Sequence, residues 1–271
     1  MQEEGRLLPD PDRLGRLVAT VLLTFAVTRI LAAPEYTITL QIPGFYFAIP
    51  LTLQTALTLL AGGLTASGMS WLMRDHPGLG GKQKIEHWLL PTVTTLVLGA
   101  TLSVLPNLTT WWIGFITAAV LTVLVFMAEY IVVEPAAPSY AAARAGLTAL
   151  SYALFLILAT SLRLFGARLV VLLPAVSLVS GLISLRILHL DGTDRWDFPW
   201  ATGISIVCTQ LAAGLHYWPA NPVQFGLALT GPLYALTNFS GNLSEGIPPR
   251  GAALGPTIIV ALSWGAALFL R

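Results

Sequence analysis

Aspartates recur at three-residue intervals in one short stretch of the chain, a spacing that could hold a divalent cation. The series is Asp191, Asp194 and Asp197, and His189 precedes it by two positions. Hard cations take oxygen ligands and keep several waters, so such a group could bring a metal ion to a phosphate. The competing interpretation is a turn at Gly192, with Asp194 or Asp197 accepting hydrogen bonds from the first N–H groups of the next helix. Capped loops are commoner than metal sites, so we predict an anchoring loop with no metal or cofactor.

A second candidate is Glu129, an acid inside an otherwise apolar run. A carboxylate within a membrane span costs about 2 to 3 kcal/mol unless it is paired, neutral or near water. We therefore predict an arginine partner, such as Arg186 or Arg250. The alternative function for the same residue is a proton or cation relay, because intramembrane acids are often functional.

Several other polar residues are expected at the same membrane edge as Glu129. The candidate functional cluster consists of Glu129, His189, Asp191, Asp194, Asp197, Glu245 and Arg250. A separate midplane pocket is suggested by Gln210 and by the Gly231–Pro232 pair, since transporters bind solutes near breaks in their helices. Hydrogen bonding between helices explains these residues equally well. His76 and His87 are predicted to be loop or interface residues, and their spacing does not suit a metal site.

The composition decides which elements must position these residues. The chain has 271 residues, 55% of them hydrophobic and 10% charged, and its mean hydropathy is +0.76. Apolar runs long enough to cross about 30 Å of hydrocarbon recur along it, so we predict an all-α, polytopic transmembrane helix bundle. About nine spans are expected, at residues 14–33, 51–73, 88–105, 111–133, 142–162, 168–188, 200–218, 222–239 and 252–270. Asn238-Phe-Ser and Asn242-Leu-Ser, at the end of the eighth span, are interpreted as polar loop and not as glycan sites.

One segment breaks the helical pattern. Between residues 36 and 49 polar and apolar residues alternate, and Pro43–Gly44 interrupts the alternation. This pattern predicts a small β-hairpin with a type II turn, lying at the membrane surface with its apolar face on the helices. A re-entrant or extended loop is the alternative.

Basic residues predict the orientation. With the amino terminus in the cytoplasm and nine crossings, ten of the Lys and Arg residues fall on the cytoplasmic side and four outside, as the positive-inside rule requires. Arg163 and Arg168 lie outside in this topology and fit the rule poorly. We therefore expect a cytoplasmic tail at residues 1–13 and a single helical domain at 14–271, in the cytoplasmic (inner) membrane.

The sequence also narrows the function classes. A net charge of +1 makes nucleic acid an unsuitable partner. No catalytic triad, nucleophile elbow or dinucleotide fingerprint is present. The single cysteine, Cys208, excludes an intrachain disulfide. The expected partners are the lipid bilayer and either another membrane protein or a second copy of the chain.

The stretch LRILHLDGTDRWDFPW, together with the nine-span layout, resembles an uncharacterised domain-of-unknown-function family of bacterial, Chloroflexi-type integral membrane proteins. This resemblance assigns no activity and no functional residue. From the residues alone a non-enzymatic scaffold or accessory subunit is the first hypothesis. A small-solute or ion transporter is the second, and a metal-dependent lipid-phosphate enzyme at the cytoplasmic face is the third, so whether the protein is an enzyme stays open.

Overall fold

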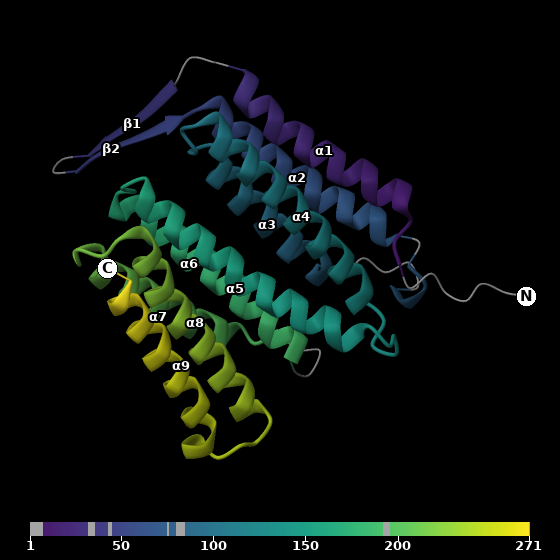
Figure 1. Cartoon of the computed structure of the whole chain (residues 1–271), viewed down its shortest axis with the longest axis vertical. Coiled ribbons are helices and arrows are strands. Elements are labelled where there is room, and N and C mark those ends of the chain that lie inside the picture. Colours follow the sequence, from purple (N-terminus) through teal and green to yellow (C-terminus); the bar gives the residue numbers. More distant parts are fainter. Residues whose placement is uncertain are drawn as a thin grey trace, which may run out of the picture. The chain divides into compact units, whose positions relative to one another are not determined.

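The computed structural model describes residues 8–31, 36–42, 45–74, 76–79, 85–191 and 196–270. Within these ranges the chain forms nine α-helices, one short 3-10 helix and two strands (Figure 1). The helices and strands are α1 (Pro11–Ile30), β1 (Tyr36–Ile42), β2 (Phe45–Leu51), α2 (Leu53–Met73), η1 (Pro77–Leu79), α3 (Glu86–Leu102), α4 (Leu108–Val132), α5 (Tyr140–Leu164), α6 (Leu169–Asp191), α7 (Phe198–His216), α8 (Pro222–Ser244) and α9 (Pro249–Phe269).

The elements divide into two compact units. Unit 1, Met1–Ala137, contains α1 to α4 and both strands, and unit 2, Pro138–Arg271, contains α5 to α9. This division was not predicted from the sequence, which indicated a single helical domain at residues 14–271. The sequence did predict the helices, and the largest shift in a boundary is at α8, which ends at Ser244 instead of Phe239.

Six of the described helices are long and apolar enough to cross a membrane, namely α2, α4, α5, α6, α7 and α9. They indicate a membrane protein. The expectation of nine spans is not supported, because three helices differ in length or polarity. Helix α1 carries charged residues near both of its ends, α3 has only 17 residues, and α8 has polar side chains along much of its length.

Strands β1 and β2 form an antiparallel pair in which Tyr36 lies opposite Leu51 and Ile42 lies opposite Phe45. The predicted turn residues, Pro43 and Gly44, lie outside the described residues. The packing of the hairpin on the helices and its place at the membrane surface stay predictions.

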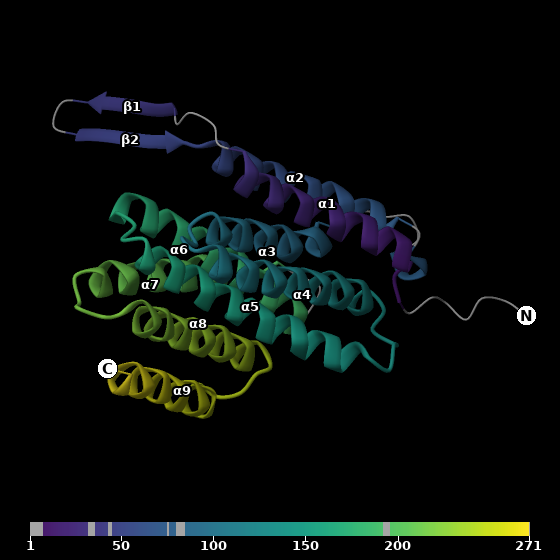
Figure 2. The same ribbon diagram turned by 45° about the horizontal axis from the view of Figure 1, so that its top comes forward.

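In unit 1, α1 and α2 lie side by side in both views (Figures 1 and 2), α2 packs on α3, and α3 packs on α4. Glycine permits two of the close approaches. A Cβ at Gly62 would lie 2.8 Å from Leu96 Cδ2, and one at Gly99 would lie 2.9 Å from Phe25 Cε1. The fully buried side chains around these contacts form the apolar core of the unit, including Phe25, Met69, Leu90, Val125 and Phe126.

In unit 2, Arg163 near the end of α5 binds the turn between α7 and α8. Its guanidinium donates to the carbonyl oxygens of His216 and Trp218, both at 2.9 Å, and to that of Ala220 at 3.3 Å. The last carbonyls of a helix lack partners within the helix, so Arg163 satisfies acceptors at the end of α7 and in the turn that follows. The guanidinium carbon also lies 5.6 Å from the centre of the Phe225 ring. These contacts give a structural role to one of the two arginines that fitted the orientation rule poorly.

Helices α8 and α9 form an antiparallel hairpin that is tied at both ends by side chains. At one end Asn242 Nδ2 donates to the carbonyl of Ala252 at 3.3 Å. At the other end Asn221 Nδ2 and Gln224 Nε2 both donate to the carbonyl of Leu270 at 3.0 Å. Asn238 and Asn242, predicted to lie in a polar loop, both belong to helix α8. Asn242 also links α8 to α9.

Candidate functional site

Glu129 lies in the last turn of α4 and is completely buried, with 0% of its surface exposed. The carboxyl end of a helix carries a partial negative charge, so the helix dipole does not stabilise an ionised carboxylate there. A buried acid in this position needs a hydrogen-bonded or oppositely charged neighbour. The structure supplies one from helix α3.

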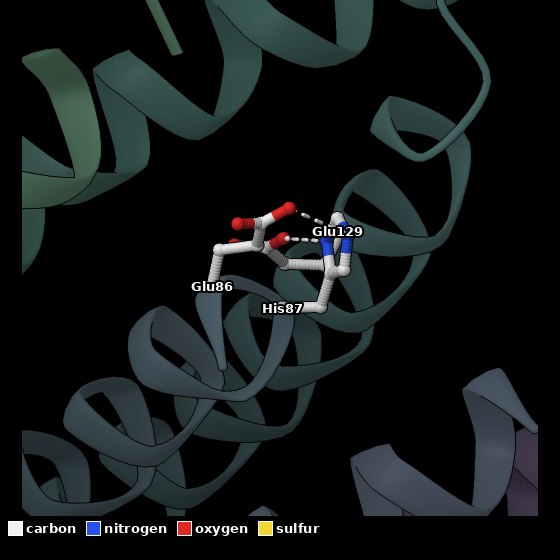
Figure 3. A network of polar contacts seen from close by, with 3 residues as sticks. All are labelled: Glu86, His87 and Glu129. Carbon is white, nitrogen blue, oxygen red and sulfur yellow. Dashed lines mark hydrogen bonds and ion pairs between the residues drawn. The ribbon is translucent and has the colours of Figure 1, made fainter. Parts of the chain in front are cut away.

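His87, in the first turn of α3, contacts two carboxylates (Figure 3). Its Nδ1 lies 3.5 Å from Glu129 Oε2, and its Nε2 lies 3.6 Å from Glu86 Oε1. Both distances are long for hydrogen bonds but lie within ion-pair range. The side chains of His87 and Glu86 are 9% and 11% exposed, so water screens these contacts only weakly. Glu86 occupies the first turn of α3, where the helix dipole favours a negative charge.

We call Glu86, His87 and Glu129 the buried array. Each carboxylate meets a different nitrogen of one imidazole, so a doubly protonated ring can donate to both. The same geometry lets a proton pass between the ring and either acid. Among the residues that the structure describes, no group of three His, Cys, Asp or Glu side chains is arranged to hold a metal ion.

A second histidine lies next to the array. The His76 ring packs edge-on against Tyr130 of α4, with 4.5 Å between the centres, and its Nδ1 accepts a hydrogen bond of 3.0 Å from the N–H of Gly78. Burial lowers the pKa of His76 below 6.5. The carboxylate of Glu134 opposes this effect, the nearby His87 adds to it, and a hydrogen bond with the Tyr130 backbone opposes it.

The lowered pKa of His76 predicts a pH-dependent stability. An unfolded chain with an ordinary histidine takes up a proton near pH 6.5, whereas the folded chain resists it until the pH reaches the lowered pKa. The melting temperature should therefore fall as the pH drops below 6.5, and this contribution should level off below the folded pKa. His76→Asn keeps an acceptor for the Gly78 N–H and should flatten the fall between about pH 7 and about pH 5. An unchanged pH profile in this variant would contradict the assignment.

The central aspartate loop gives a mixed outcome. The ring of His189 stacks on Trp196, with 4.7 Å between centres and 15° between planes. Asp191 ends α6, and Asp194 lies outside the described residues. Asp197 occupies the N-cap position of α7, as predicted, but its side chain accepts no capping hydrogen bond. The capping role predicted for the Asp197 carboxylate is therefore wrong.

The remaining members of the predicted cluster belong to unit 2, whereas the buried array belongs to unit 1. Glu245 follows the last residue of α8, Arg250 lies in the first turn of α9, and both are exposed. Arg186 is buried within α6. Because Arg186 and Arg250 belong to unit 2, their predicted pairing with Glu129 in unit 1 stays a prediction.

The residues of the predicted midplane pocket have different surroundings. Gln210 is exposed on α7, whereas Pro232 is buried inside α8, which continues through it. Proline lacks the N–H that would donate to the carbonyl oxygen of Ala228, four residues earlier. The indole Nε1 of Trp264 donates to this oxygen instead, at 3.1 Å. Gly231 leaves room for Ser263 of α9 to approach closely. The Gly231–Pro232 pair thus joins α8 to α9 without breaking α8, which agrees with the alternative of hydrogen bonding between helices.

In a comparison with protein families, residues 33–270 match one family, described as a protein of unknown function (DUF5656). The chain belongs to the DUF5656 family. Comparisons with curated proteins and with solved structures found no match. The resemblance to a domain-of-unknown-function family is confirmed, whereas the bacterial, Chloroflexi-type origin stays a prediction.

The DUF5656 match includes the whole buried array and helices α5 to α9, and it begins after α1. Sequence reasoning selected Glu129 but assigned His87 to a loop or interface and did not consider Glu86. One signal was present: the predicted third span begins just after His87 and the predicted fourth span ends just after Glu129. Antiparallel neighbours place those two ends together, so His87 was a natural partner for Glu129.

Proposed function

We propose that this protein is an ion transporter that carries protons across the membrane, with the buried array taking up and releasing them. One observation carries the proposal: a buried imidazole faces a carboxylate from each of its two nitrogens, at 3.5 and 3.6 Å. Ionisable groups inside membrane proteins are costly and are typical of proton relays and ion pathways. The array joins the start of α3 to the end of α4, so it would act at one end of a proton path.

Buried hydroxyl groups support a continuation of that path into unit 1. Thr94 and Thr122 lie about two helical turns from His87 and Glu129 along their helices. Both are fully buried. The hydroxyls of Thr65 and Thr95, also fully buried, lie 2.9 Å apart between α2 and α3. A hydroxyl both donates and accepts, so such groups are suited to passing protons.

The other two hypotheses receive less support. A scaffold or accessory subunit, the first hypothesis from sequence, has no need for an imidazole held between two acids away from water. A lipid-phosphate enzyme would need the aspartates and Glu245 to converge on a cleft, and Glu245 is exposed at the end of α8. The transporter hypothesis, second from sequence, explains the array best.

Proton flux in liposomes tests the proposal. Purified protein is reconstituted with an enclosed pH-sensitive dye, and a potassium gradient with valinomycin sets an inside-negative potential. We expect faster acidification than in protein-free liposomes. Glu129→Gln, which keeps the side-chain size but cannot exchange a proton in the same way, should lose most of the flux. Glu245→Gln, at an exposed acid, should retain it. Flux equal to that of empty liposomes, or unaffected by Glu129→Gln, would overturn the proposal.

We also propose that the amino terminus is cytoplasmic and that the protein lies in a bacterial inner membrane. This rests on the excess of basic residues in alternate loops, and it requires α1, α3 and α8 to cross the membrane as well. Single cysteines placed in a Cys208→Ala background test it. An impermeant maleimide should label Asn107→Cys in intact cells and Ser139→Cys only after the cells are opened. The reverse pattern would show that the orientation is wrong.

A further inference from the structure

Unit 2 contains an open groove of about 630 Å³ along the first half of α5. One side of α5 lines it, together with Tyr234 of α8. Alanines at four-residue intervals, from Ala141 to Ala149, form its floor. Residues four apart share one face of a helix, and alanine has no atom beyond Cβ, so the floor is narrow, smooth and apolar.

The two ends of the groove differ in chemistry. Near the start of α5, Tyr140 and Arg144 supply a phenol and a guanidinium. At the deeper end the rings of Tyr152 and Tyr234 lie 5.1 Å apart. The hydroxyl of Tyr152 is engaged with Thr237 Oγ1, so this end presents mainly ring surface. A polar, cationic entrance thus leads to an aromatic end.

The dimensions suit a chain that enters from the membrane surface. Helix α5 is one of the candidate spans. At 1.5 Å per residue, Tyr140 and Tyr152 are separated by about 18 Å along the axis, slightly more than half of the roughly 30 Å hydrocarbon core. A groove of this length matches one acyl chain of one leaflet. Tyrosine and arginine near a span end lie at headgroup level.

We propose that this groove binds one anionic phospholipid. Arg144 and the Tyr140 hydroxyl hold the headgroup phosphate, because a guanidinium can donate two parallel hydrogen bonds to phosphate oxygens. One acyl chain lies along the alanine floor and ends against Tyr152 and Tyr234. The site is independent of the buried array, so it does not rest on proton transport.

Lipid binding to the purified full chain, measured by native mass spectrometry, tests the proposal. We expect phosphatidylglycerol to bind in preference to phosphatidylcholine. Arg144→Gln should weaken its binding by about tenfold, the effect of losing hydrogen bonds to a charged partner. Ala145→Leu, which places a bulky side chain on the exposed floor, should weaken both lipids. Arg250→Gln, which removes the same charge from an exposed position in α9, should bind as the wild type does. Melting curves recorded without added lipid check that each variant is folded.

Three results would overturn the proposal. Equal binding of the two lipids would mean that the charge at Arg144 does not select the headgroup. Unchanged binding in Ala145→Leu would mean that the lipid lies elsewhere on the protein surface. Competition by millimolar inorganic phosphate would mean that the site recognises a free anion and that the acyl chain contributes nothing.

Discussion

Glu129→Ala is expected to lower the free energy of unfolding by about 3 kcal/mol, the scale for removing one partner of a buried ionic pair. The change leaves His87 without one of its two carboxylates and leaves a cavity in a position that is 0% exposed. For a domain of this size, roughly 2 to 4 °C of melting temperature corresponds to 1 kcal/mol, so a fall of roughly 6 °C or more is expected in detergent.

Two further variants separate the pair from its surroundings. Glu245→Ala removes an exposed acid and should leave the melting temperature nearly unchanged. The double variant Glu129→Ala, His87→Ala should be less destabilised than the sum of the single variants, because contacting residues couple by about 0.5 to 3 kcal/mol. Strict additivity would contradict the contact between His87 and Glu129.

Arg163→Met is expected to be similarly harmful, lowering the free energy of unfolding by about 3 kcal/mol. It removes three hydrogen bonds from a charged donor to the carbonyls of His216, Trp218 and Ala220. Bonds of this kind contribute about 1.5 to 3 kcal/mol each, and water at the helix end replaces part of that loss. Thermal melting in detergent provides the measurement.

Arg168→Met is the matched control, since Arg168 is exposed five residues further along the chain. It removes the same charge and should change the melting temperature little. Arg163→Lys should recover only part of the loss, because an ammonium group cannot reproduce the fork of donors that reaches three carbonyls. Equal melting temperatures for Arg163→Met and Arg168→Met would show that the clamp contributes nothing.

The helices were predictable because apolar runs bounded by proline and polar residues mark their ends. The number of spans was not predictable in the same way. In α8 the polar residues Gln224 and Asn242 hydrogen-bond to the ends of α9, so they lower the hydropathy of a helix that packs against its neighbour. Hydropathy measures composition, whereas those contacts depend on tertiary structure.

The candidate site was predictable only in part. Glu129 was selected because an acid in an apolar run is costly wherever it points. Its contact with His87 depends on which face of α3 packs against α4. Apolar residues occur on all sides of both helices, so the sequence does not show which faces meet. For Asp197 the position was predicted correctly and the interaction was not. The residue precedes the first turn of α7, but its side chain makes no capping hydrogen bond. A cap position follows from the chain boundary, whereas a cap bond also requires the side chain to turn toward the helix.

The hydrogen bond from Trp264 to the Ala228 carbonyl also bears on the order in which the chain assembles. Within α8 the Ala228 carbonyl has no helical donor, because Pro232 lacks an N–H, and Ala228 is buried, so it needs a partner from elsewhere in the protein. Trp264 of α9 donates to that carbonyl only after the two helices have met. Pro232 thus leaves one carbonyl of α8 without a partner, and the next helix in the chain, α9, supplies the donor. This favours pairing of α8 with α9 over pairing with another helix as the protein folds.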